Sequence, residues 1–375
     1  MKRVTWTGYL LCAATTFAAR PAVALPKEPP DLPTIDGPET TSLIKELRGQ
    51  LVRPKPTGGV LSALLPSLEQ ITLRPPEKYS PIKELSGVDR AGRVVVVETA
   101  GNQLTLRLVT PDDKLGKEIV KRADTGFQSR AIGRPVLSPT GSLIAFVSKT
   151  RSLWLEGKLK LTYRDGELEV WSAEKKERVQ TQVRALDRSL AWLADGKELI
   201  FSALVRPDTL PDSLVEDYSR VTGSGLLPVV EDKVPVVYRM EVPGRKFAAL
   251  CIGRRSVVSI AGDALLVEGI GYMWMRYDLK SKTLTAVKLP GVYDDGSTGV
   301  YEGGAIGLHG DLVVYWGLPT TGSEQRTTTG NSPFTGSKQM PSIKVARPST
   351  GHFQTIIPYM DPRYANYYCD VSVSK

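Results

Sequence analysis

The sequence predicts an all-β protein, a β-propeller of four-stranded blades, with six blades favoured and five or seven as alternatives. Three observations lead to this fold class. A tight turn that contains glycine precedes a short apolar strand five times along the chain. Further strands follow each of these hairpins, and the whole unit returns about every 40–50 residues, a period typical of propeller blades. The chain of 375 residues is also long enough to bury a large core.

The clearest hairpin occupies residues 134–148, RPVLSPTGSLIAFVS. Pro139 fixes φ at about −65°, which suits the first corner of a turn, and Gly141 tolerates the positive φ of the last corner. The run after the turn is apolar and rich in strand formers, as in a buried strand. The same arrangement recurs at Gly92, Gly141, Gly196, Gly262 and Gly310, which are 49, 55, 66 and 48 residues apart.

Two more strands are predicted after each hairpin. The third strands of the units fall at 103–108, 167–172, 236–240, 273–278 and 343–347, and several alternate apolar with polar residues. The fourth, outer strands fall at 118–120, 178–180, 247–250, 284–287 and 353–357. Since one blade cannot bury both of its faces, the blades must stack on their neighbours and close into a ring.

The two ends of the repeat region offer strands for a sixth, composite blade. These are residues 70–73 (QITL) and 367–373 (YYCDVSV). In such a ring Cys251 would lie about halfway round from Cys369, which argues against a disulfide unless the C-terminal tail leaves the ring. Export permits the bridge, and two buried thiols are equally compatible with the sequence.

Residues 1–24 have the three parts of a secretory signal peptide. Lys2 and Arg3 precede an apolar stretch that is too short to span a membrane, and small residues follow it before Leu25. We therefore expect a periplasmic or secreted protein with no transmembrane segment in the mature chain. A Pro-rich N-terminal arm at 25–60 and a propeller domain at 61–375 complete the expected organisation.

Two inserted loops interrupt the repeats, 206–234 in the third unit and 318–341 in the fifth. Within the first, residues 212–216 (DSLVE) are able to cap and start a short helix. The second is long and polar. Loops of this length in a compact domain are usually functional or disordered, and the sequence leaves both readings open.

The stretch at 134–148 resembles the repeat of TolB-like propellers, in which Ser-Pro-Asp-Gly precedes an apolar strand; Thr140 stands where Asp is usual. Residues 193–196 (LADG) are a second partial match. The resemblance implies the blade fold that periplasmic TolB shares with the propeller of prolyl oligopeptidases, and it implies no active site. The arm at 25–60 is too short for the N-terminal α/β domain of TolB, and we expect no α/β-hydrolase domain, so neither protein's role is implied.

The best polar cluster lies between the fourth and fifth units. Asp294, Asp295 and Ser297 offer oxygen ligands that suit Ca²⁺, although Asp and Gly at this point also suit a plain turn. His309 and Asp311 flank a turn glycine and complete the candidate ligand-binding residues. We expect no catalytic residues, metal or other cofactor, because the chain has 2 histidines and no convincing nucleophile elbow.

The formal net charge of +9 favours an anionic partner, although a scattered basic surface would give the same total. No basic run with interleaved aromatic residues indicates nucleic-acid binding. Our leading hypothesis is an exported, non-enzymatic β-propeller, a binding or scaffold module for a protein or an anionic polymer of the bacterial envelope. The alternatives are a propeller enzyme of the lactonase, lyase or glycosidase type, with its site at the central funnel, and a subunit of a larger complex.

Overall fold

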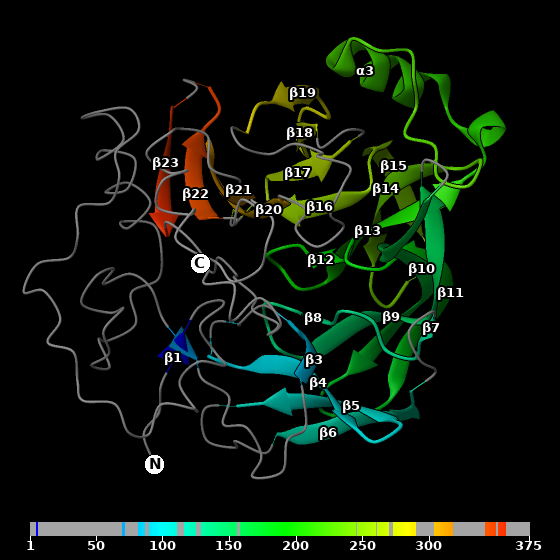
Figure 1. Ribbon diagram of the computed structural model, residues 1–375, viewed down its shortest axis with the longest axis vertical. Helices are drawn as coiled ribbons and strands as arrows, with labels where there is room; N and C mark the ends of the chain where they lie inside the picture. The colour runs from blue at the N-terminus through cyan, green and yellow to red at the C-terminus, as the bar shows by residue number, and fades with distance from the viewer. Residues whose placement is uncertain are drawn as a thin grey trace, which may run out of the picture. The chain divides into compact units, whose positions relative to one another are not determined.

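A computed structural model of the chain describes four four-stranded sheets, one five-stranded sheet and one pair of short strands (Figure 1). It describes residues 5–6, 70–71, 82–86, 89, 91–110, 116–124, 129–155, 158–244, 246–259, 261–269, 273–289, 304–317, 342–349 and 352–357. The chain forms two compact units. The four-sheet unit takes in residues 79–288 and 296–299, and the C-terminal unit takes in 1–78, 289–295 and 300–375.

Four antiparallel sheets, each with its strands in chain order, make up the four-sheet unit. The first contains β3 (Ile82–Leu85), β4 (Val94–Ala100), β5 (Gln103–Val109) and β6 (Lys117–Ala123). The second contains β7 (Ser129–Arg130), β8 (Val136–Leu137), β9 (Leu143–Leu155), β10 (Lys158–Ser172) and β11 (Arg178–Leu186). The third contains β12 (Ala191–Trp192), β13 (Glu198–Val205), β14 (Val234–Glu241) and β15 (Phe247–Ile252). The fourth contains β16 (Arg255–Val258), β17 (Ala264–Glu268), β18 (Trp274–Asp278) and β19 (Leu284–Val287).

The C-terminal unit contains one more sheet of the same kind. Its strands are β20 (Gly304–His309), β21 (Leu312–Gly317), β22 (Ser342–Arg347) and β23 (His352–Ile357), again antiparallel and in chain order. Two short strands, β1 (Thr5–Trp6) and β2 (Gln70–Ile71), pair with each other. The described partner of Gln70–Ile71 is therefore β1; the other segment expected in a sixth blade, 367–373, lies outside the described residues.

The sheets of the four-sheet unit are stacked face to face, and β9 shows why its sequence is apolar throughout. Ile144 and Phe146 pack with residues of the first sheet, such as Val95 and Leu106. Ala145 and Val147 point the other way and pack with residues of the third sheet, such as Phe201. Successive side chains of a strand face opposite sides, so a strand between two neighbours is buried on both. This confirms the predicted stacking.

The turn at Ser138–Gly141 explains the repeated glycine. Gly141 has φ of 68° and its N–H donates to the Ser138 carbonyl at 2.7 Å. Arg93, beside the corresponding turn of the first sheet, donates from Nη2 to the Thr140 carbonyl at 2.7 Å. A Cβ on Gly141 would lie 1.8 Å from that guanidinium. The glycine therefore satisfies both the left-handed backbone and the close approach of the neighbouring turn.

Strands β9 and β10 are longer than the expected 142–148 and 167–172. They have 13 and 15 residues and continue past the other strands of their sheet as a hairpin. The pairing runs to Leu155 and Lys158, with a register shift between Lys160 and Arg164. The sequence predicted no element for 149–166; residues 158–162 (KLKLT) alternate polar and apolar types, as an exposed strand does.

The first inserted loop is folded. It contains a short 3-10 helix, η2 (Pro207–Thr209), and the helix α3 (Asp212–Thr222), which confirms the predicted helix. The expected cap is wrong in detail: the N-cap residue is Pro211, with no side-chain cap, and Asp212 is the first helical residue, where its charge complements the helix dipole. The helix lies against β15 and β19, and Tyr218 packs into the core with 1% of its surface exposed.

The described residues test several other expectations only in part. Cys251 is a buried free thiol, whereas Cys369 lies outside the described part of the chain, as do the second inserted loop (318–341) and the arm at 25–60. Most of the expected signal peptide also lies outside it. No helix among the described residues is long and apolar enough to cross a membrane.

Candidate functional site

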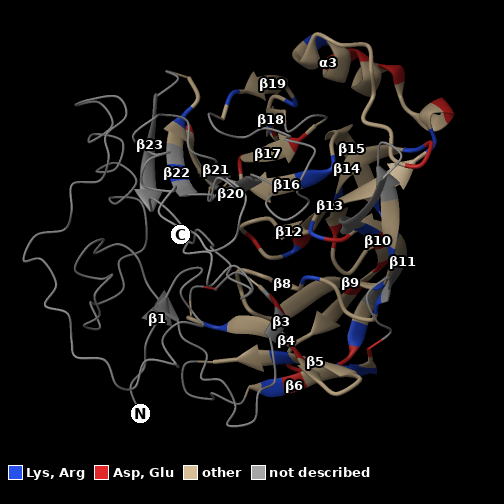
Figure 2. Cartoon of the chain, in the orientation of Figure 1, with Lys and Arg blue, Asp and Glu red and all other residues tan. Residues whose placement is uncertain are grey.

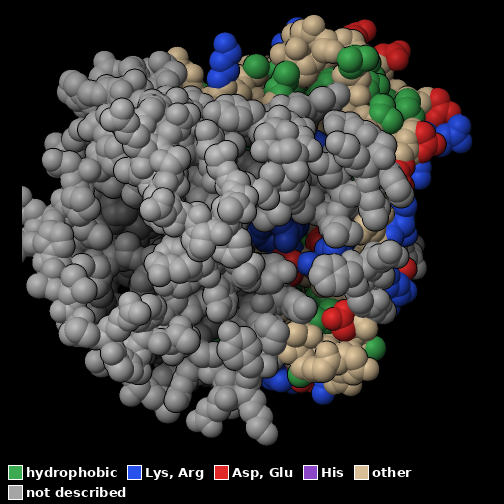
Figure 3. All heavy atoms as spheres, in the orientation of Figure 1, with side chains coloured by type: hydrophobic (Ala, Val, Ile, Leu, Met, Phe, Trp, Pro, Cys, Tyr) green, Lys and Arg blue, Asp and Glu red, His purple; other side chains and the backbone are tan. Residues whose placement is uncertain are grey.

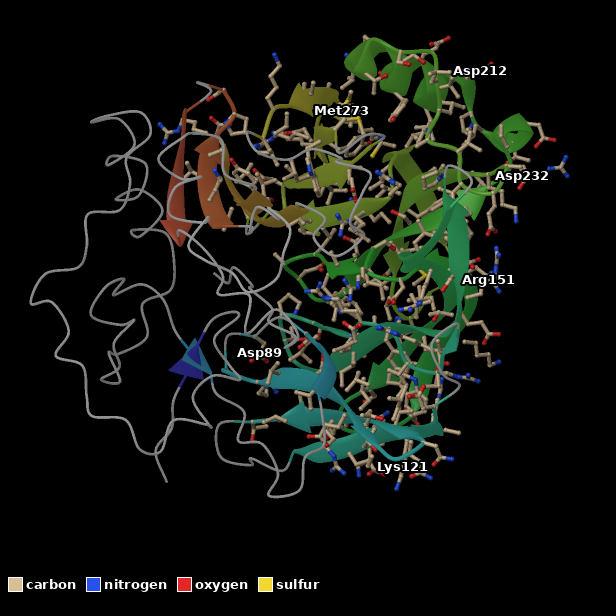
Figure 4. All side chains as sticks on the ribbon, in the orientation of Figure 1. Asp89, Lys121, Arg151, Asp212, Asp232 and Met273 are labelled. Carbon is tan, nitrogen blue, oxygen red and sulfur yellow. The ribbon has the colours of Figure 1, made fainter. Side chains whose placement is uncertain are left out.

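Charged residues gather where the first strands of the four sheets approach one another. Glu84 comes from β3, Arg130 from β7, Arg188 from the segment before β12 and Arg255 from β16. We call the following set the arginine cluster: Arg130, Arg134, Arg164, Arg188 and Arg255, with Glu84 and Asp187. Figure 2 shows basic and acidic positions around β8 and β12, and in Figure 4 nitrogen-bearing side chains gather in the same region.

Glu84 is the central carboxylate of the arginine cluster. It accepts hydrogen bonds from Arg130 Nη1 and, at 3.2 Å, from Arg188 Nη2, while 5% of its side chain is exposed. Burial alone would raise the pKa of Glu84, but the positive charges of Arg188, Arg130 and Arg134 outweigh it and hold the pKa below its usual range. Glu84 is therefore an ionised counter-ion shared between neighbouring sheets.

Asp187 is held by the backbone instead. Its Oδ1 accepts hydrogen bonds from the backbone N–H of Arg134 at 3.0 Å and of Arg188 at 3.1 Å. A Cβ on Gly133 would lie 2.4 Å from the same oxygen, so the carboxylate packs directly on this glycine. Burial, with the negative charge of Glu84, raises the pKa of Asp187 above its usual range. Asp187 thus joins the segment that carries Arg134, between β7 and β8, to the segment that carries Arg188, between β11 and β12.

Positive charge exceeds negative charge within the arginine cluster. Glu84 raises the pKa of Arg188 above its ordinary value. Burial, together with the positive charges of Arg130 and Arg188, lowers the pKa of Arg164, of which 5% is exposed. The described cluster contains five guanidinium groups and two carboxylates.

Glu268 lies beside the cluster and does not remove the excess. It pairs with Arg255 at 2.5 Å and with Arg254 at 3.5 Å, and its side chain is 0% exposed. Counting Glu268 and Arg254 adds one charge of each sign. The cluster is open to solvent at three arginines, since 21%, 31% and 22% of the Arg130, Arg188 and Arg255 side chains are exposed.

A second feature joins the extended β9–β10 hairpin to the folded insertion. Residues 149–165 and 206–234 together form what we call the accessory platform. Arg151 of β9 pairs with Glu231 of the insertion at 2.7 Å and with Asp165 of β10 at 2.9 Å. Leu153, Leu186 and Val230 form a small buried core beneath these pairs. Figure 4 shows Arg151 and Asp232 on the same flank of the unit.

The accessory platform presents apolar side chains to solvent. Among the described residues, the large exposed hydrophobic side chains are Leu226 at 75%, Phe247 at 52% and Val229 at 47%. Leu226 and Val229 belong to the insertion, just after α3. Figure 3 shows hydrophobic side chains on the visible surface around α3. Large apolar side chains in a folded, anchored segment are typical of contact surfaces.

The candidate residues from the sequence lie elsewhere in the chain. Asp294, Asp295 and Ser297 fall outside the described residues. His309 is the last residue of β20 rather than part of a turn. Asp311 follows Gly310 in the turn to β21, and its carboxylate accepts a hydrogen bond from Ser349 Oγ. Within the described part of the chain, no group of three His, Cys, Asp or Glu side chains is placed to hold a metal ion.

Sequence reasoning missed the arginine cluster, although a signal was present. Gly92, Gly141, Gly196 and Gly262 follow Glu84, Arg134, Arg188 and Arg255 by 8, 7, 8 and 7 residues. A charged residue thus recurs 7 or 8 residues before the turn glycine in four successive units. Our repeat alignment began at the hairpin turns and did not compare the residues before them.

Comparisons with known proteins agree with the fold. No protein-family model matches the chain, and no curated protein matches it. Solved structures that resemble it include TolB from Acinetobacter baumannii, with 14% identity over 72% of this chain and 54% of that one, at a TM-score of 0.42. The β-propeller domain of the Trilobed protease from Pyrococcus furiosus shows 12% identity over 74% and 72%, at 0.39. A nidogen/laminin complex shows 8% over 77% and 83%, at 0.42.

These similarities are at the level of the fold. The chain resembles TolB and other β-propeller domains in its successive four-stranded antiparallel sheets, which confirms the predicted resemblance. It spans about half the length of the TolB that it matches. The number of blades stays a prediction, because residues outside the described part of the chain separate the sheets of the two units.

Proposed function

We propose that the chain is an exported, non-enzymatic β-propeller, a binding or scaffold module for a protein or polymer of the bacterial envelope. The accessory platform is its contact surface. The observation that carries this proposal is that the insertion at 206–234 is folded and anchored while exposing Leu226 and Val229. A segment fixed by Tyr218 and by the Arg151–Glu231 pair loses little conformational freedom when a partner binds, which favours recognition.

The test is a crosslinking pull-down of the exported chain from an envelope fraction, followed by mass spectrometry. The wild type is compared with the double variant Leu226→Asp, Val229→Asp, which places two charges on the contact surface. The matched control is Ala100→Asp, Ala123→Asp, which adds the same charge at exposed positions of β4 and β6. Circular dichroism establishes that all three proteins are folded.

We expect one dominant partner that the platform variant loses and the control keeps. Equal recovery by all three proteins would contradict the platform as the contact surface. Recovery of no partner, together with turnover of a sugar or lactone substrate by the wild type, would favour the alternative of a propeller enzyme.

A further inference from the structure

We propose that the insertion at 206–234 binds its partner protein through a segment of the partner that is both basic and apolar. The inference rests on the function proposed above, since it names the class of partner that the accessory platform takes. Two features of the insertion carry it. Acidic side chains on α3 face solvent, and large apolar side chains are exposed on the segment that follows the helix.

The insertion differs in charge from the rest of the chain. It contains six acidic and three basic residues, a net charge of −3, whereas the whole chain has a net charge of +9. The residues outside the insertion therefore carry +12. A surface whose charge is opposite to that of the rest of the molecule attracts basic partners, which the remainder of the molecule repels. The charge of the whole chain is thus a poor guide to what the insertion binds.

Two acidic side chains of α3 are exposed and available to a partner. Asp212 and Glu216 are four residues apart, which places them on one face of the helix. Arg220 lies on the same face but is paired with Asp217 at 2.6 Å. Neither Asp212 nor Glu216 forms an ion pair with any residue that the structure describes.

The acidic and apolar side chains belong to one folded surface. The segment 223–229 follows α3 directly. Its Leu227 packs on the same buried cluster as Leu214 and Tyr218 of the helix. The helix and the segment therefore share one core and expose their outer sides, among them Leu226. Figure 3 shows acidic side chains next to hydrophobic ones on the visible surface around α3.

A basic amphipathic segment has the chemistry that fits this surface. Its apolar side chains would cover Leu226 and Val229 and remove them from water. Its Lys or Arg side chains would approach the carboxylates of Asp212 and Glu216. Exposed charge pairs contribute little free energy each, so they mainly select the partner and speed its association. An acidic segment would meet like charges at the same place.

The test is fluorescence anisotropy of labelled peptides with the exported chain. The probe is a short amphipathic peptide of leucine and lysine. One comparison peptide replaces its lysines by glutamate, and another replaces its leucines by serine. The site variant is Asp212→Asn with Glu216→Gln, which removes two charges and keeps the shapes of the side chains. The matched control is Glu174→Gln with Glu177→Gln, which removes two exposed carboxylates between β10 and β11.

We expect the leucine–lysine peptide to bind about tenfold more tightly than either comparison peptide, although the chain as a whole is basic. The site variant should weaken this binding about three- to tenfold, and the control should leave it unchanged. Added sodium chloride should reduce the difference between the site variant and the wild type. No saturable binding of the leucine–lysine peptide, tighter binding of the leucine–glutamate peptide, or equal weakening by both variants would overturn the inference.

The peptide results and the pull-down separate the class of partner from the contact surface. The variant Leu226→Asp, Val229→Asp could lose its partner in the pull-down while the peptides show no preference for lysine. The accessory platform would then remain the contact surface, and only the class of partner would be wrong. If that variant keeps its partner, the platform is not the contact surface, and the inference fails together with the proposed function.

Discussion

The four-sheet unit contains two buried charge networks that differ in their balance. In one, Glu169 of β10 accepts hydrogen bonds from Arg122 at 2.8 and 2.7 Å, from Ser148 at 2.5 Å and from Trp171 at 2.8 Å. This network joins the first and second sheets, and its single carboxylate is matched by a single guanidinium. In the arginine cluster, five guanidinium groups surround two carboxylates.

The difference lies in how each network joins its sheets. The Glu169 network is complete: both carboxylate oxygens are satisfied, and Arg122 also lies 5.6 Å from the centre of the Phe146 ring. Such a network stabilises the stacking of two sheets and needs no further partner. In the arginine cluster a single carboxylate, Glu84, accepts hydrogen bonds from Arg130 and Arg188, which come from different sheets.

The largest expected effect is on the balanced network. Replacing Glu169 by Ala leaves Arg122 without its carboxylate and should lower the free energy of unfolding by about 3–5 kcal/mol. The control is Glu167→Ala in the same strand, which removes an exposed pair with Lys149 and should cost less than about 1 kcal/mol. Urea unfolding measures both. Similar losses for the two variants would show that Glu169 is not a structural joint.

Acidification should change the contributions of Glu169 and Asp187 to stability in opposite directions. The pKa of Glu169 lies below its usual range, because hydrogen bonds from Arg122 and Ser148 outweigh the opposing effect of burial. Its contribution is therefore present above the ordinary Glu pKa of about 4.3 and lost as pH falls through the folded value. The raised pKa of Asp187 has the opposite sign: its contribution is present below the ordinary Asp pKa and lost as pH rises through the folded value.

Stability measured by urea unfolding between pH 7 and pH 3 should therefore fall less steeply in Glu169→Gln than in the wild type. It should fall more steeply in Asp187→Asn, because that variant lacks the carboxyl whose protonation favours the folded state. Parallel curves for the three proteins would contradict the assigned directions.

The smallest effect concerns a pair that is balanced but exposed. Arg151 and Glu231 lie 2.7 Å apart, with 48% and 21% of their side chains exposed. Arg151→Ala should lower the free energy of unfolding by about 1 kcal/mol or less, because exposed ion pairs contribute little. Thermal unfolding measures it. A loss of unfolding free energy as large as that in Glu169→Ala would show that the pairing of charges matters more for stability than their burial.

The fold was readable from the sequence because its signals are local. Turn glycines such as Gly141, followed by an apolar run such as 143–147, identify a buried hairpin without any long-range information. The length of β9 was missed because residues after 148 alternate in a way that suits either an exposed strand or a loop. The helix α3 was found from its sequence, while its packing through Tyr218 depends on contacts with distant strands.

The candidate site was harder to predict, because it is assembled from four sheets. Arg130, Arg188 and Arg255 are far apart in the sequence, and the stacking of the sheets brings them together. The polar cluster that does stand out in the sequence, at 294–297, lies outside the described residues. A run of polar residues can be recognised in the sequence. Charged residues that are far apart in the sequence are seen to be neighbours only when the stacked sheets are known.

The most direct test of this account compares Glu84 with Glu169. Glu84→Gln and Glu169→Gln each remove a buried carboxylate that pairs with arginine, and urea unfolding measures both. We predict that each variant lowers the free energy of unfolding by about 2–4 kcal/mol, because each leaves arginine without its carboxylate. A loss below about 1 kcal/mol in Glu84→Gln would contradict the account of Glu84 as a counter-ion shared between neighbouring sheets.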